Sequence, residues 1–331
     1  MSSLRSAKRW VGVVLFTALT FLQGNAASLP ITALTGKRVV FVGDSITYSG
    51  QYIEFLEAVL RLRHPALTFD WLNLGLPSET VSGLSEPGHA GGKFPRPDLH
   101  ERLGRLIEKT QPALIVACYG MNDGIYHPLS EARTSAFQAG IEKLRAAAAR
   151  AGAEIWHLTP PVFDPQPIRA QTLPAGLDEY RSPFVGYNEV LDAYSAWLIA
   201  RGADAWKVID IHGPMNAALA KGRAKDPAFR LAGDGVHMDV SGHWIVCGEI
   251  LSALGVANSE SLDVVSADFV KPGKPLKILE RVQRRHRLLK DAWLNAVGHL
   301  RPGMAKGLAL KDAQSEAANI EKELQIILAR P

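Results

Sequence analysis

Three residues of this chain have the types and the spacing that a serine nucleophile requires. Ser45 lies in the motif GDSIT, directly after the apolar run from Lys37 to Val42. Asp234 and His237 are three residues apart in DGVHMD, so a single turn can bring the carboxylate to the imidazole. In such an arrangement the histidine accepts the serine proton and the aspartate orients the histidine. These residues predict attack of a hydroxyl group on a carbonyl carbon.

Attack on a carbonyl also needs donors for the negative charge that develops on its oxygen. We expect Ser45 to lie on a tight turn into a helix, where its own amide and the helix dipole favour that charge. Gly75 directly follows another apolar run, and without a side chain its amide can approach the oxygen closely. The side-chain amide of Asn122, in the motif GMND, offers a third donor. Ser45, Gly75 and Asn122 are therefore the predicted oxyanion hole.

Residues beside these motifs are predicted to order loops or to contact the substrate. Asp44 and Asp123 each neighbour a predicted site residue, and we expect them mainly to accept backbone amides. The loop from Ser78 to Asp98 is rich in Gly and Pro and is a predicted wall or lid of the site. Tyr126 follows a strand, and packing and substrate stacking are equal alternatives for it. Candidate substrate contacts in the loop are His89, Lys93 and Arg96.

Short apolar runs alternate with longer amphipathic stretches over most of the chain. This alternation predicts a parallel sheet with helices on both faces, and the ligand site of such a sheet lies beyond the carboxyl ends of its strands. The predicted strands are 37–42, 68–74, 113–118, 154–158 and 207–211. The predicted helices of this region are 52–63, 99–109, 130–151, 183–200 and 241–254.

Four motifs, in the order GDSIT, NLGLPSET, GMND and DGVHMDVSGH, resemble blocks I, II, III and V of the SGNH (GDSL-type) hydrolases. The resemblance covers residues 37–254 and implies a three-layer α/β/α, flavodoxin-like fold with about five parallel strands. It also implies that Asp234 completes a triad. The four roles that give the family its name would then belong to Ser45, Gly75, Asn122 and His237.

Each motif has a structural alternative when it is taken alone. Gly-Asp-Ser is common in turns and helix caps, and Asn122 could merely stabilise its own turn. His237 with Asp239 and His243 could form a capped helix start or part of a metal site. The four motifs together and in order favour catalysis over these alternatives.

Other enzyme motifs fail on particular residues. The Gly-x-Ser-x-Gly motif of α/β-hydrolases is broken by Thr47, and the stretch 88–93 has the wrong glycine spacing for a phosphate loop. The zinc-binding helix with two histidines around a glutamate is absent from the sequence. We therefore predict no cofactor and no metal.

Residues 1–27 have the layout of a secretory signal peptide, with basic residues, an apolar run and small residues in that order. The apolar run, from Trp10 to Leu22, is shorter than the roughly 20 residues that a membrane-spanning helix needs. We predict export to the periplasm or the extracellular space and no stable membrane span after cleavage, with an uncleaved anchor as the alternative. The two cysteines, Cys118 and Cys247, lie in separate apolar segments and are predicted to be buried free thiols.

The chain divides into the signal peptide, a predicted hydrolase domain at 28–258 and a helical C-terminal extension at 259–331. The extension has predicted helices at 274–290 and 310–328, and the first carries seven Lys or Arg against one acid. We expect its apolar residues to pack on the hydrolase domain and its basic face to be solvated. Binding to an anionic glycan or a membrane surface is the alternative for that face. The formal net charge of +4 gives no reason to predict a nucleic-acid partner.

The predicted function is that of an exported serine esterase acting through an acyl-enzyme on a small-molecule or glycan ester. Export and open polar loops favour removal of O-acetyl groups from carbohydrate. The alternatives within the family are a lipid esterase or lysophospholipase, a thioesterase and an acyltransferase. A catalytically silent glycan-binding protein on the same fold is the alternative of another class. The oligomeric state is not predicted.

Overall fold

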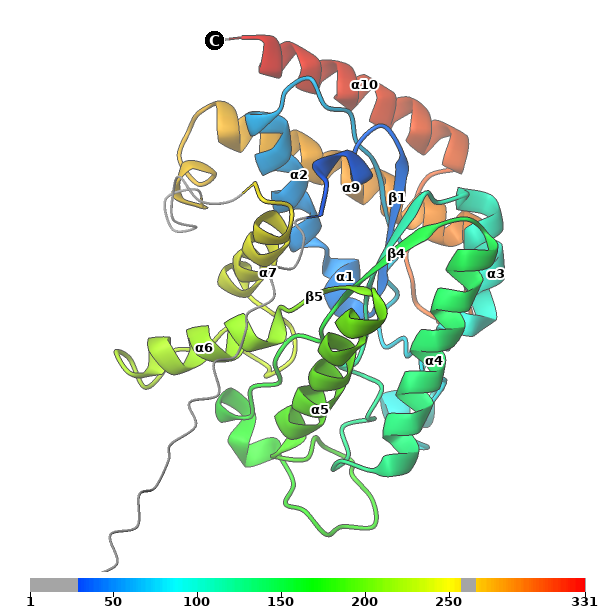
Figure 1. Ribbon diagram of the computed structural model, residues 1–331, viewed down its shortest axis with the longest axis vertical. Helices are drawn as coiled ribbons and strands as arrows, with labels where there is room; N and C mark the ends of the chain where they lie inside the picture. Colours follow the sequence, from blue (N-terminus) through cyan, green and yellow to red (C-terminus); the bar gives the residue numbers. More distant parts are fainter. Residues whose placement is uncertain (1–28, 257–265, 331) are drawn as a thin grey trace, which may run out of the picture.

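The computed structural model describes residues 29–256 and 266–330, and its centre is a five-stranded parallel sheet flanked by helices (Figure 1). The strands are β1 (Arg38–Gly43), β2 (Asp70–Asn73), β3 (Leu114–Cys118), β4 (Glu154–Leu158) and β5 (Lys207–Ile209). All five predicted strands are confirmed, and no end differs from its predicted position by more than two residues. The predicted signal peptide and the predicted domain boundary after residue 258 lie outside the described residues.

The helices cover the sheet and account for the longer amphipathic stretches. They are α1 (Ser45–Ser49), α2 (Gln51–Arg63), α3 (Leu99–Thr110), α4 (Glu131–Arg150), α5 (Tyr187–Ala200), α6 (His212–Arg223), α7 (Val240–Ala253), α9 (Lys274–Val297) and α10 (Leu310–Ala329). The sequence analysis did not predict α6, whose segment begins with His-Gly-Pro and carries another glycine near its end. Asp210 supports its start by accepting the backbone amides of His212 and Gly213, at 3.0 and 3.2 Å.

The strand order β2-β1-β3-β4-β5 is that of a flavodoxin-like sheet, as the resemblance implies. The chain leaves β1 towards one edge and returns to its other side at β3, so loops diverge between β1 and β3. Such a divergence leaves a crevice beyond the carboxyl ends of these strands. Ser45 follows β1 and Asn122 follows β3, so both lie at this crevice.

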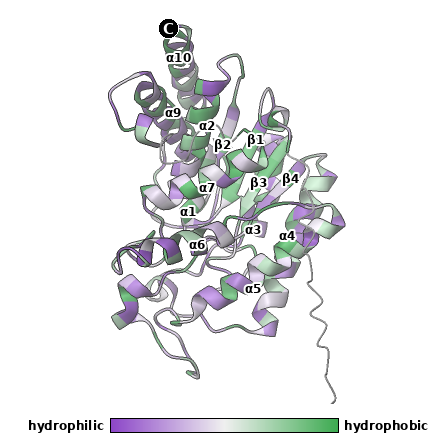
Figure 2. Cartoon of the chain, turned by 60° about the vertical axis from the view of Figure 1, so that its left-hand side comes forward, coloured by the Kyte–Doolittle hydropathy of each residue, from purple (hydrophilic) through white to green (hydrophobic). Residues whose placement is uncertain are grey.

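The strands are mostly apolar and lie inside the molecule (Figure 2), although β1, β2, β4 and β5 each begin with a charged residue. Val39, Val40 and Val42 of β1 are fully buried, as expected for a parallel strand covered on both faces. Cys118 and Cys247 are buried free thiols, as predicted. Among the described residues, no helix combines the length and the apolar character needed to cross a membrane.

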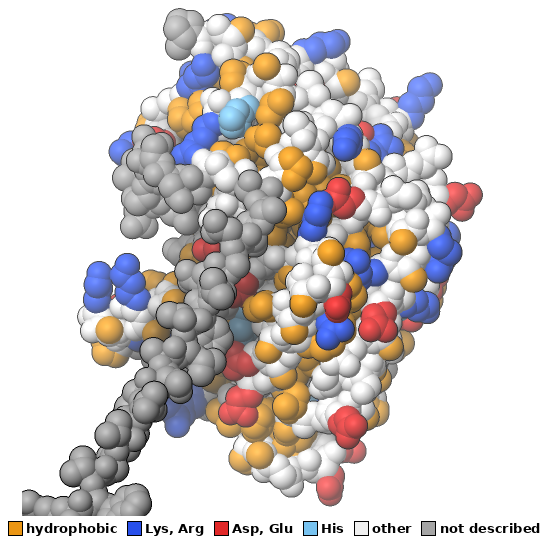
Figure 3. All heavy atoms as spheres, viewed as in Figure 1, with side chains coloured by type: hydrophobic (Ala, Val, Ile, Leu, Met, Phe, Trp, Pro, Cys, Tyr) orange, Lys and Arg blue, Asp and Glu red, His pale blue; other side chains and the backbone are white. Residues whose placement is uncertain are grey.

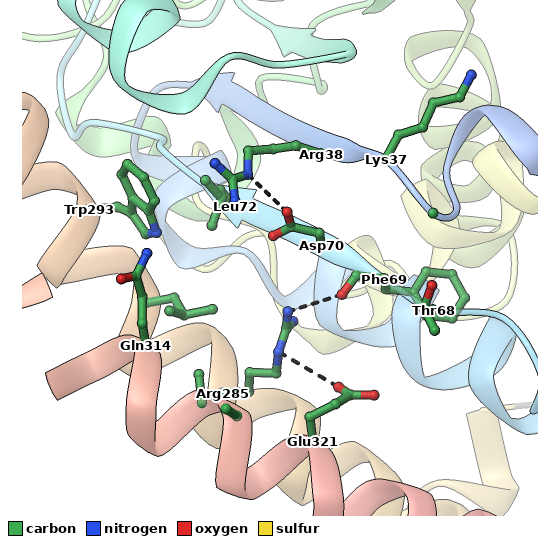
Figure 4. Close-up of a pocket in the computed structure, with 14 residues that line it drawn as sticks. Lys37, Arg38, Thr68, Phe69, Asp70, Leu72, Arg285, Trp293, Gln314 and Glu321 are labelled. Carbon is green, nitrogen blue, oxygen red and sulfur yellow. Dashed lines mark hydrogen bonds and ion pairs between the residues drawn. The ribbon is translucent and has the colours of Figure 1, made fainter. Parts of the chain in front are cut away.

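The C-terminal helices pack on the sheet edge formed by β2. Helices α9 and α10 lie against each other, and α9 contacts α2 and β2 (Figure 1). Helix α9 is longer than predicted, because the apolar residues Trp293, Leu294 and Val297 continue its buried face. A cavity of about 510 Å³ remains between these helices and the starts of β1 and β2, lined by Arg38, Asp70, Arg285 and Trp293 among others (Figure 4). It lies at the opposite end of the sheet from Ser45.

The basic face of α9 is only partly solvated, which corrects the expectation from its composition. Arg285 and His286 are buried, and both lie beside the fully buried Glu57 on α2, with His286 Nε2 2.7 Å from a carboxylate oxygen. Burial acts to raise the pKa of Glu57, but Arg61, Arg285 and His286 hold it well below its usual value. On the face of the molecule that Figure 3 shows, Lys and Arg side chains are spread among apolar and acidic ones.

Candidate active site

Ser45, His237 and Asp234 form a chain of two hydrogen bonds. His237 Nε2 lies 2.8 Å from Ser45 Oγ, and His237 Nδ1 lies 2.6 Å from Asp234 Oδ2. An ionised aspartate only accepts, so Nδ1 carries the proton and Nε2 is left to accept the serine hydroxyl proton. The structure thus brings the three predicted catalytic residues together in the order that proton transfer requires.

The loop before α7 holds the aspartate and the histidine on one turn. Asp234 Oδ1 accepts the backbone amides of Val236 and His237, at 3.0 and 2.8 Å. Partial burial raises the pKa of Asp234, but the hydrogen bonds from His237 and these amides outweigh it and lower the pKa below its usual value. Gly235 has a φ of 78°, and a Cβ there would lie 2.5 Å from Asp164 O, so this turn requires glycine.

Ser45 is the first residue of α1. Its predecessor Asp44 caps the helix by accepting the Ile46 amide at 2.9 Å. Asp44 is buried, and desolvation, with Asp123 adding repulsion, raises its pKa to about 7. The Asp44 side chain therefore stabilises the turn that presents the serine.

The structure does not leave the Gly75 amide free, which corrects its predicted role as an oxyanion donor. The Gly75 N–H donates to Asn73 Oδ1 at 3.0 Å. The glycine is needed for packing instead, because a Cβ there would lie 2.3 Å from the backbone nitrogen of Tyr48 in α1. Gly75 thus sets how closely its loop approaches the helix that carries Ser45.

In the same loop, the backbone amide of Ser78 has no hydrogen-bond acceptor among the described residues. The Leu76 N–H donates to Gly43 O and the Glu79 N–H donates to Leu76 O, while the residue before Ser78 is proline. Within the described part of the chain, the Ser78 N–H meets no acceptor. Ser78 also has a φ of 68°, and such strain in a residue other than glycine gathers at functional sites. Its amide therefore replaces that of Gly75 as the candidate donor; sequence reasoning missed it because a serine gives no sign of a left-handed backbone.

Asn122 is held from both sides, so its amide has a fixed orientation. Its Oδ1 accepts from Arg96 Nη1 at 2.9 Å and from the Tyr126 hydroxyl at 3.2 Å. Its Nδ2 donates to Glu79 O at 3.2 Å, which places the Ser78–Glu79 segment beside it. Since Nδ2 has two protons, one remains for a substrate oxygen.

Arg96 and Tyr126 therefore orient the side chain of Asn122 and are not isolated surface residues. Arg96 is buried, forms a two-point ion pair with Glu86 at 2.7 Å and lies over the Tyr126 ring. Tyr126 and its predecessor Ile125 both have positive φ angles, of 58° and 47°. A β-branched residue there is strained, so the loop after β3 is another strained segment at the site. Tyr126 thus packs against Arg96 and also donates a hydrogen bond to Asn122.

A buried ion pair connects the loop after β2 to α3 and was not visible in the sequence. The Glu79 carboxylate accepts from Arg102 at 2.6 and 2.7 Å and from the Tyr119 hydroxyl at 2.6 Å. Arg102 also donates to Leu74 O at 2.7 Å, next to Gly75. Glu79 lies in the motif NLGLPSET, but Arg102 gives no sign of its burial, since charged residues on amphipathic helices usually face solvent.

Asp123 ties the loop after β3 to the loop that follows β2. It accepts the backbone amides of Val81, Ser82 and Gly120, each at 2.8 Å. Burial raises its pKa to about 6, and these amides act in the opposite direction. These three hydrogen bonds hold the two loops together.

The residues weighed for a metal site have structural contacts. Asp239 caps α7 by accepting the Gly242 amide at 3.0 Å. His243 is buried, lies 3.2 Å from Ser49 Oγ and stacks on Tyr52, and burial lowers its pKa to about 4. Over residues 29–256 and 266–330, no cluster of three His, Cys, Asp or Glu side chains is arranged to hold a metal ion.

The loop from Ser78 to Asp98 borders a second cavity, of about 950 Å³. Its lining residues are mostly polar or glycine and come from 86–92, His127 and 178–181. Glu86 in this lining is the partner of Arg96, so the cavity wall is connected directly to Asn122. His89 pairs with Glu86 at 3.2 Å and lines the cavity, whereas Lys93 is exposed and is not brought to the site.

Comparison with solved structures shows the same fold at low sequence identity. A gut microbial diltiazem-metabolizing enzyme has a TM-score of 0.52 at 21% identity, over 68% of this chain and 48% of its own. An alpha/beta hydrolase enzyme from the metagenome of Lake Arreo has a TM-score of 0.50 at 21% identity, over 68% of this chain and 98% of its own. An acetylxylan esterase from Geobacillus stearothermophilus has a TM-score of 0.50 at 18% identity, over 69% and 98%. The chain thus spans about half of the first of these and nearly all of the other two.

No curated protein matches this chain. A family model does match, that of the GDSL-like lipase/acylhydrolase family, over residues 41–245. This span is more than half of the chain and contains all four motifs, the end of β1 and the whole of β2 to β5. The chain therefore belongs to the GDSL-like lipase/acylhydrolase family and is an ester hydrolase of that family.

Proposed function

We propose that this protein is an exported esterase that cleaves carboxylic esters through an acyl-enzyme on Ser45, and that its substrates are O-acetyl groups on carbohydrate. The observation that carries the mechanism is the hydrogen-bonded chain from Asp234 through His237 to Ser45. A hydroxyl, a neutral base and a carboxylate at these distances are what nucleophilic ester cleavage requires.

In the first half of the reaction Ser45 Oγ attacks the ester carbonyl carbon while its proton passes to His237 Nε2. The resulting oxyanion accepts hydrogen bonds from the amides of Ser45 and Ser78 and from Asn122 Nδ2. As the ester bond breaks, His237 gives the proton to the departing alcohol oxygen. Asp234 keeps the imidazole in the required tautomer and stabilises the imidazolium.

In the second half a water molecule attacks the acyl group on Ser45. His237 accepts a proton from the water, and the oxyanion is held by the same donors. Collapse of this intermediate returns the proton to Ser45 Oγ and releases the carboxylic acid. Apart from this water molecule, both halves use groups of this chain.

Two features support a carbohydrate ester as the substrate. The side chains of His237 and Asp234 are 53% and 56% exposed, so a large substrate can reach them at the surface. The cavity joined to Asn122 through Arg96 offers carboxylates, imidazoles and glycine backbone, which suit sugar hydroxyls better than an alkyl chain. The resemblance to an acetylxylan esterase is in keeping with this assignment.

The test compares hydrolysis of nitrophenyl acetate, nitrophenyl octanoate and acetylated xylan by the mature chain and by Ser45→Ala. We expect release of acetate from xylan and a preference for the acetyl over the octanoyl ester, both lost in Ser45→Ala. A preference for octanoate would indicate a lipid esterase. No turnover of any ester, with retained xylan binding, would indicate a silent glycan-binding protein.

Export is part of this proposal and rests on the layout of residues 1–27. Expression of the full chain in a Gram-negative host should give a protein outside the cytoplasm whose first residue is Ala27 or Ser28. A full-length chain retained in the cytoplasm or extracted with the membrane would contradict it.

A further inference from the structure

We infer that the C-terminal extension contributes to catalysis by positioning two elements of the active site. Lys290 and Asp291 of α9 position the nucleophile helix α1, and Arg301 positions the loop that carries Ser78. These three residues lie beyond the span that the family model matches. The inference rests on the proposed function, since it takes Ser45 as the nucleophile. They are positioning residues, because they contact the elements that hold the reacting groups.

Helix α1 is too short to hold its own position. It has five residues, Ser45–Ser49, and ends at Gly50 in a left-handed conformation. A helix of one turn is unstable by itself, and the carbonyl groups at its end need partners from elsewhere. The orientation of Ser45 therefore depends on contacts made from outside α1.

Lys290 supplies such a contact at the carboxyl end of α1. Its Nζ donates to Tyr48 O at 2.7 Å and lies 3.9 Å from the centre of the Tyr48 ring. A cation at the end of a helix satisfies an unpaired carbonyl and complements the helix dipole, and its position over the ring adds a cation–π attraction.

Asp291 holds the same tyrosine by its hydroxyl. Tyr48 donates to Asp291 Oδ1 at 3.1 Å, and burial together with Asp291 raises the tyrosine pKa to about 12, so the donor stays protonated. Tyr48 is also the residue against which Gly75 packs without room for a Cβ. Its backbone amide donates to Asp44 O at 2.9 Å. A shift of Tyr48 would thus move α1 relative to the loop after β2.

Arg301 holds that loop directly. Its Nε donates to Pro77 O at 2.9 Å, and Pro77 immediately precedes Ser78. The guanidinium also lies 5.3 Å from the centre of the Phe94 ring, in the loop that borders the second cavity. Loops that carry oxyanion donors need support of this kind, because a displacement of about 1 Å can cost a hundredfold in rate.

The segment that carries Arg301 is itself tied to α9. Gly307 lies so close to Asp291 and Ala292 that a Cβ there would be 2.8 Å from the Ala292 nitrogen. Arg105 of α3 donates to Val297 O at 3.0 Å and fixes the end of α9. Lys290, Asp291 and Arg301 thus belong to one packed unit that contacts α1 on one side and the Ser78 loop on the other.

The experiment compares Lys290→Met and Arg301→Met with Arg281→Met in the full chain. Arg281 lies on the same helix and pairs with Glu323 of α10 at 2.6 Å, away from α1 and the Ser78 loop. It is a matched control for loss of a cation from the extension. The measurements are kcat and KM for nitrophenyl acetate, the rate of labelling by a fluorophosphonate and the melting temperature.

We expect Lys290→Met and Arg301→Met to lower kcat and the labelling rate by about tenfold to a hundredfold, with KM changed less than about twofold. Lys290→Arg and Arg301→Lys should restore most of the rate, because they keep a donor for Tyr48 O and Pro77 O. Arg281→Met should keep kcat within about twofold even where its melting temperature falls by a similar amount.

The inference is wrong if Lys290→Met and Arg301→Met lower the melting temperature as Arg281→Met does but leave kcat and the labelling rate unchanged. Where a methionine variant does not fold, Tyr48→Phe carries the test, since it removes only the hydroxyl that Asp291 accepts. It should lower kcat by about threefold to tenfold, and an unchanged kcat counts against the inference. Activity that survives Ser45→Ala in the same assay would instead refute the proposed nucleophile.

Discussion

His237 Nε2 lies 2.8 Å from Ser45 Oγ although the two residues are 192 positions apart in the chain. The serine is fixed by the start of α1 and the histidine by the turn before α7. Their contact therefore depends on how these two elements pack at the carboxyl edge of the sheet. Variants that leave the packing intact can separate the roles of the individual side chains.

Asp234→Asn should lower kcat by about a hundredfold to ten-thousandfold while the fold persists. An asparagine can present its NH₂ group to Nδ1 and so favour the wrong imidazole tautomer, although its oxygen can still accept the amides of Val236 and His237. Steady-state kinetics and circular dichroism check this. A variant with the activity of the parent chain would show that another group orients His237.

Asn122→Ala should lower kcat by about a hundredfold to a thousandfold with little change in KM, because the lost donor acts on the charged oxygen. Asn122→Asp keeps the oxygen that accepts from Arg96 and Tyr126 but puts a second carboxylate oxygen where Nδ2 was. It should be at least as slow as the alanine variant. An alanine variant with a raised KM and normal kcat would make Asn122 a ground-state binding residue.

Gly75→Ala should lower kcat strongly and Ser78→Gly should change it little, although both variants change one small residue of the same loop. An alanine at position 75 would place its Cβ 2.3 Å from the Tyr48 nitrogen and push α1 away, so we expect a loss of about a hundredfold in kcat and a lower melting temperature. Glycine at position 78 relieves the left-handed backbone of Ser78 and keeps its amide, so activity should stay within about threefold with no loss of stability. Equal loss in both variants would contradict these roles.

Between about pH 4 and pH 7, the free energy of unfolding of the chain should decrease as the pH rises. This decrease should be steeper than in the Asp44→Asn variant. Burial raises the Asp44 pKa from 3.8 to about 7, so in this window the folded state keeps a proton that the unfolded state releases. A raised carboxyl pKa means that its stabilising contribution is present at low pH and is lost as pH rises, by up to about 1.4 kcal/mol per unit.

In the Asp44→Asn variant, asparagine retains the oxygen that caps α1 but does not titrate. The slope of the unfolding free energy against pH should therefore be smaller. It should not vanish, because burial also raises the Asp123 pKa, to about 6. Chemical unfolding at several pH values measures the slope. Asp226→Asn, at an exposed aspartate that likewise accepts a backbone amide, is the control and should match the parent chain. Equal slopes for all three proteins would show that Asp44 is ionised throughout the window.

The sequence by itself determined the layers and the family. Most of the strands contain a short run of apolar residues such as that of β3, and a strand buried on both faces leaves that pattern whatever its neighbours are. The same holds for the long amphipathic helices and for the four motifs, whose residues are close together in the chain. Helix α6 was not predicted, because its segment is weakly helical and its start depends on Asp210, which is not part of the helix.

Only the tertiary structure decided which groups surround the predicted serine and histidine. The bond of the Gly75 amide to Asn73, the free amide of Ser78 and the hold of Arg96 on Asn122 depend on backbone angles and on contacts between distant segments. The contacts of Lys290 and Arg301 with α1 and the Ser78 loop join residues more than 200 positions apart. Composition shows that such side chains are charged, but which of them turn inward is settled by the partners that the fold places beside them.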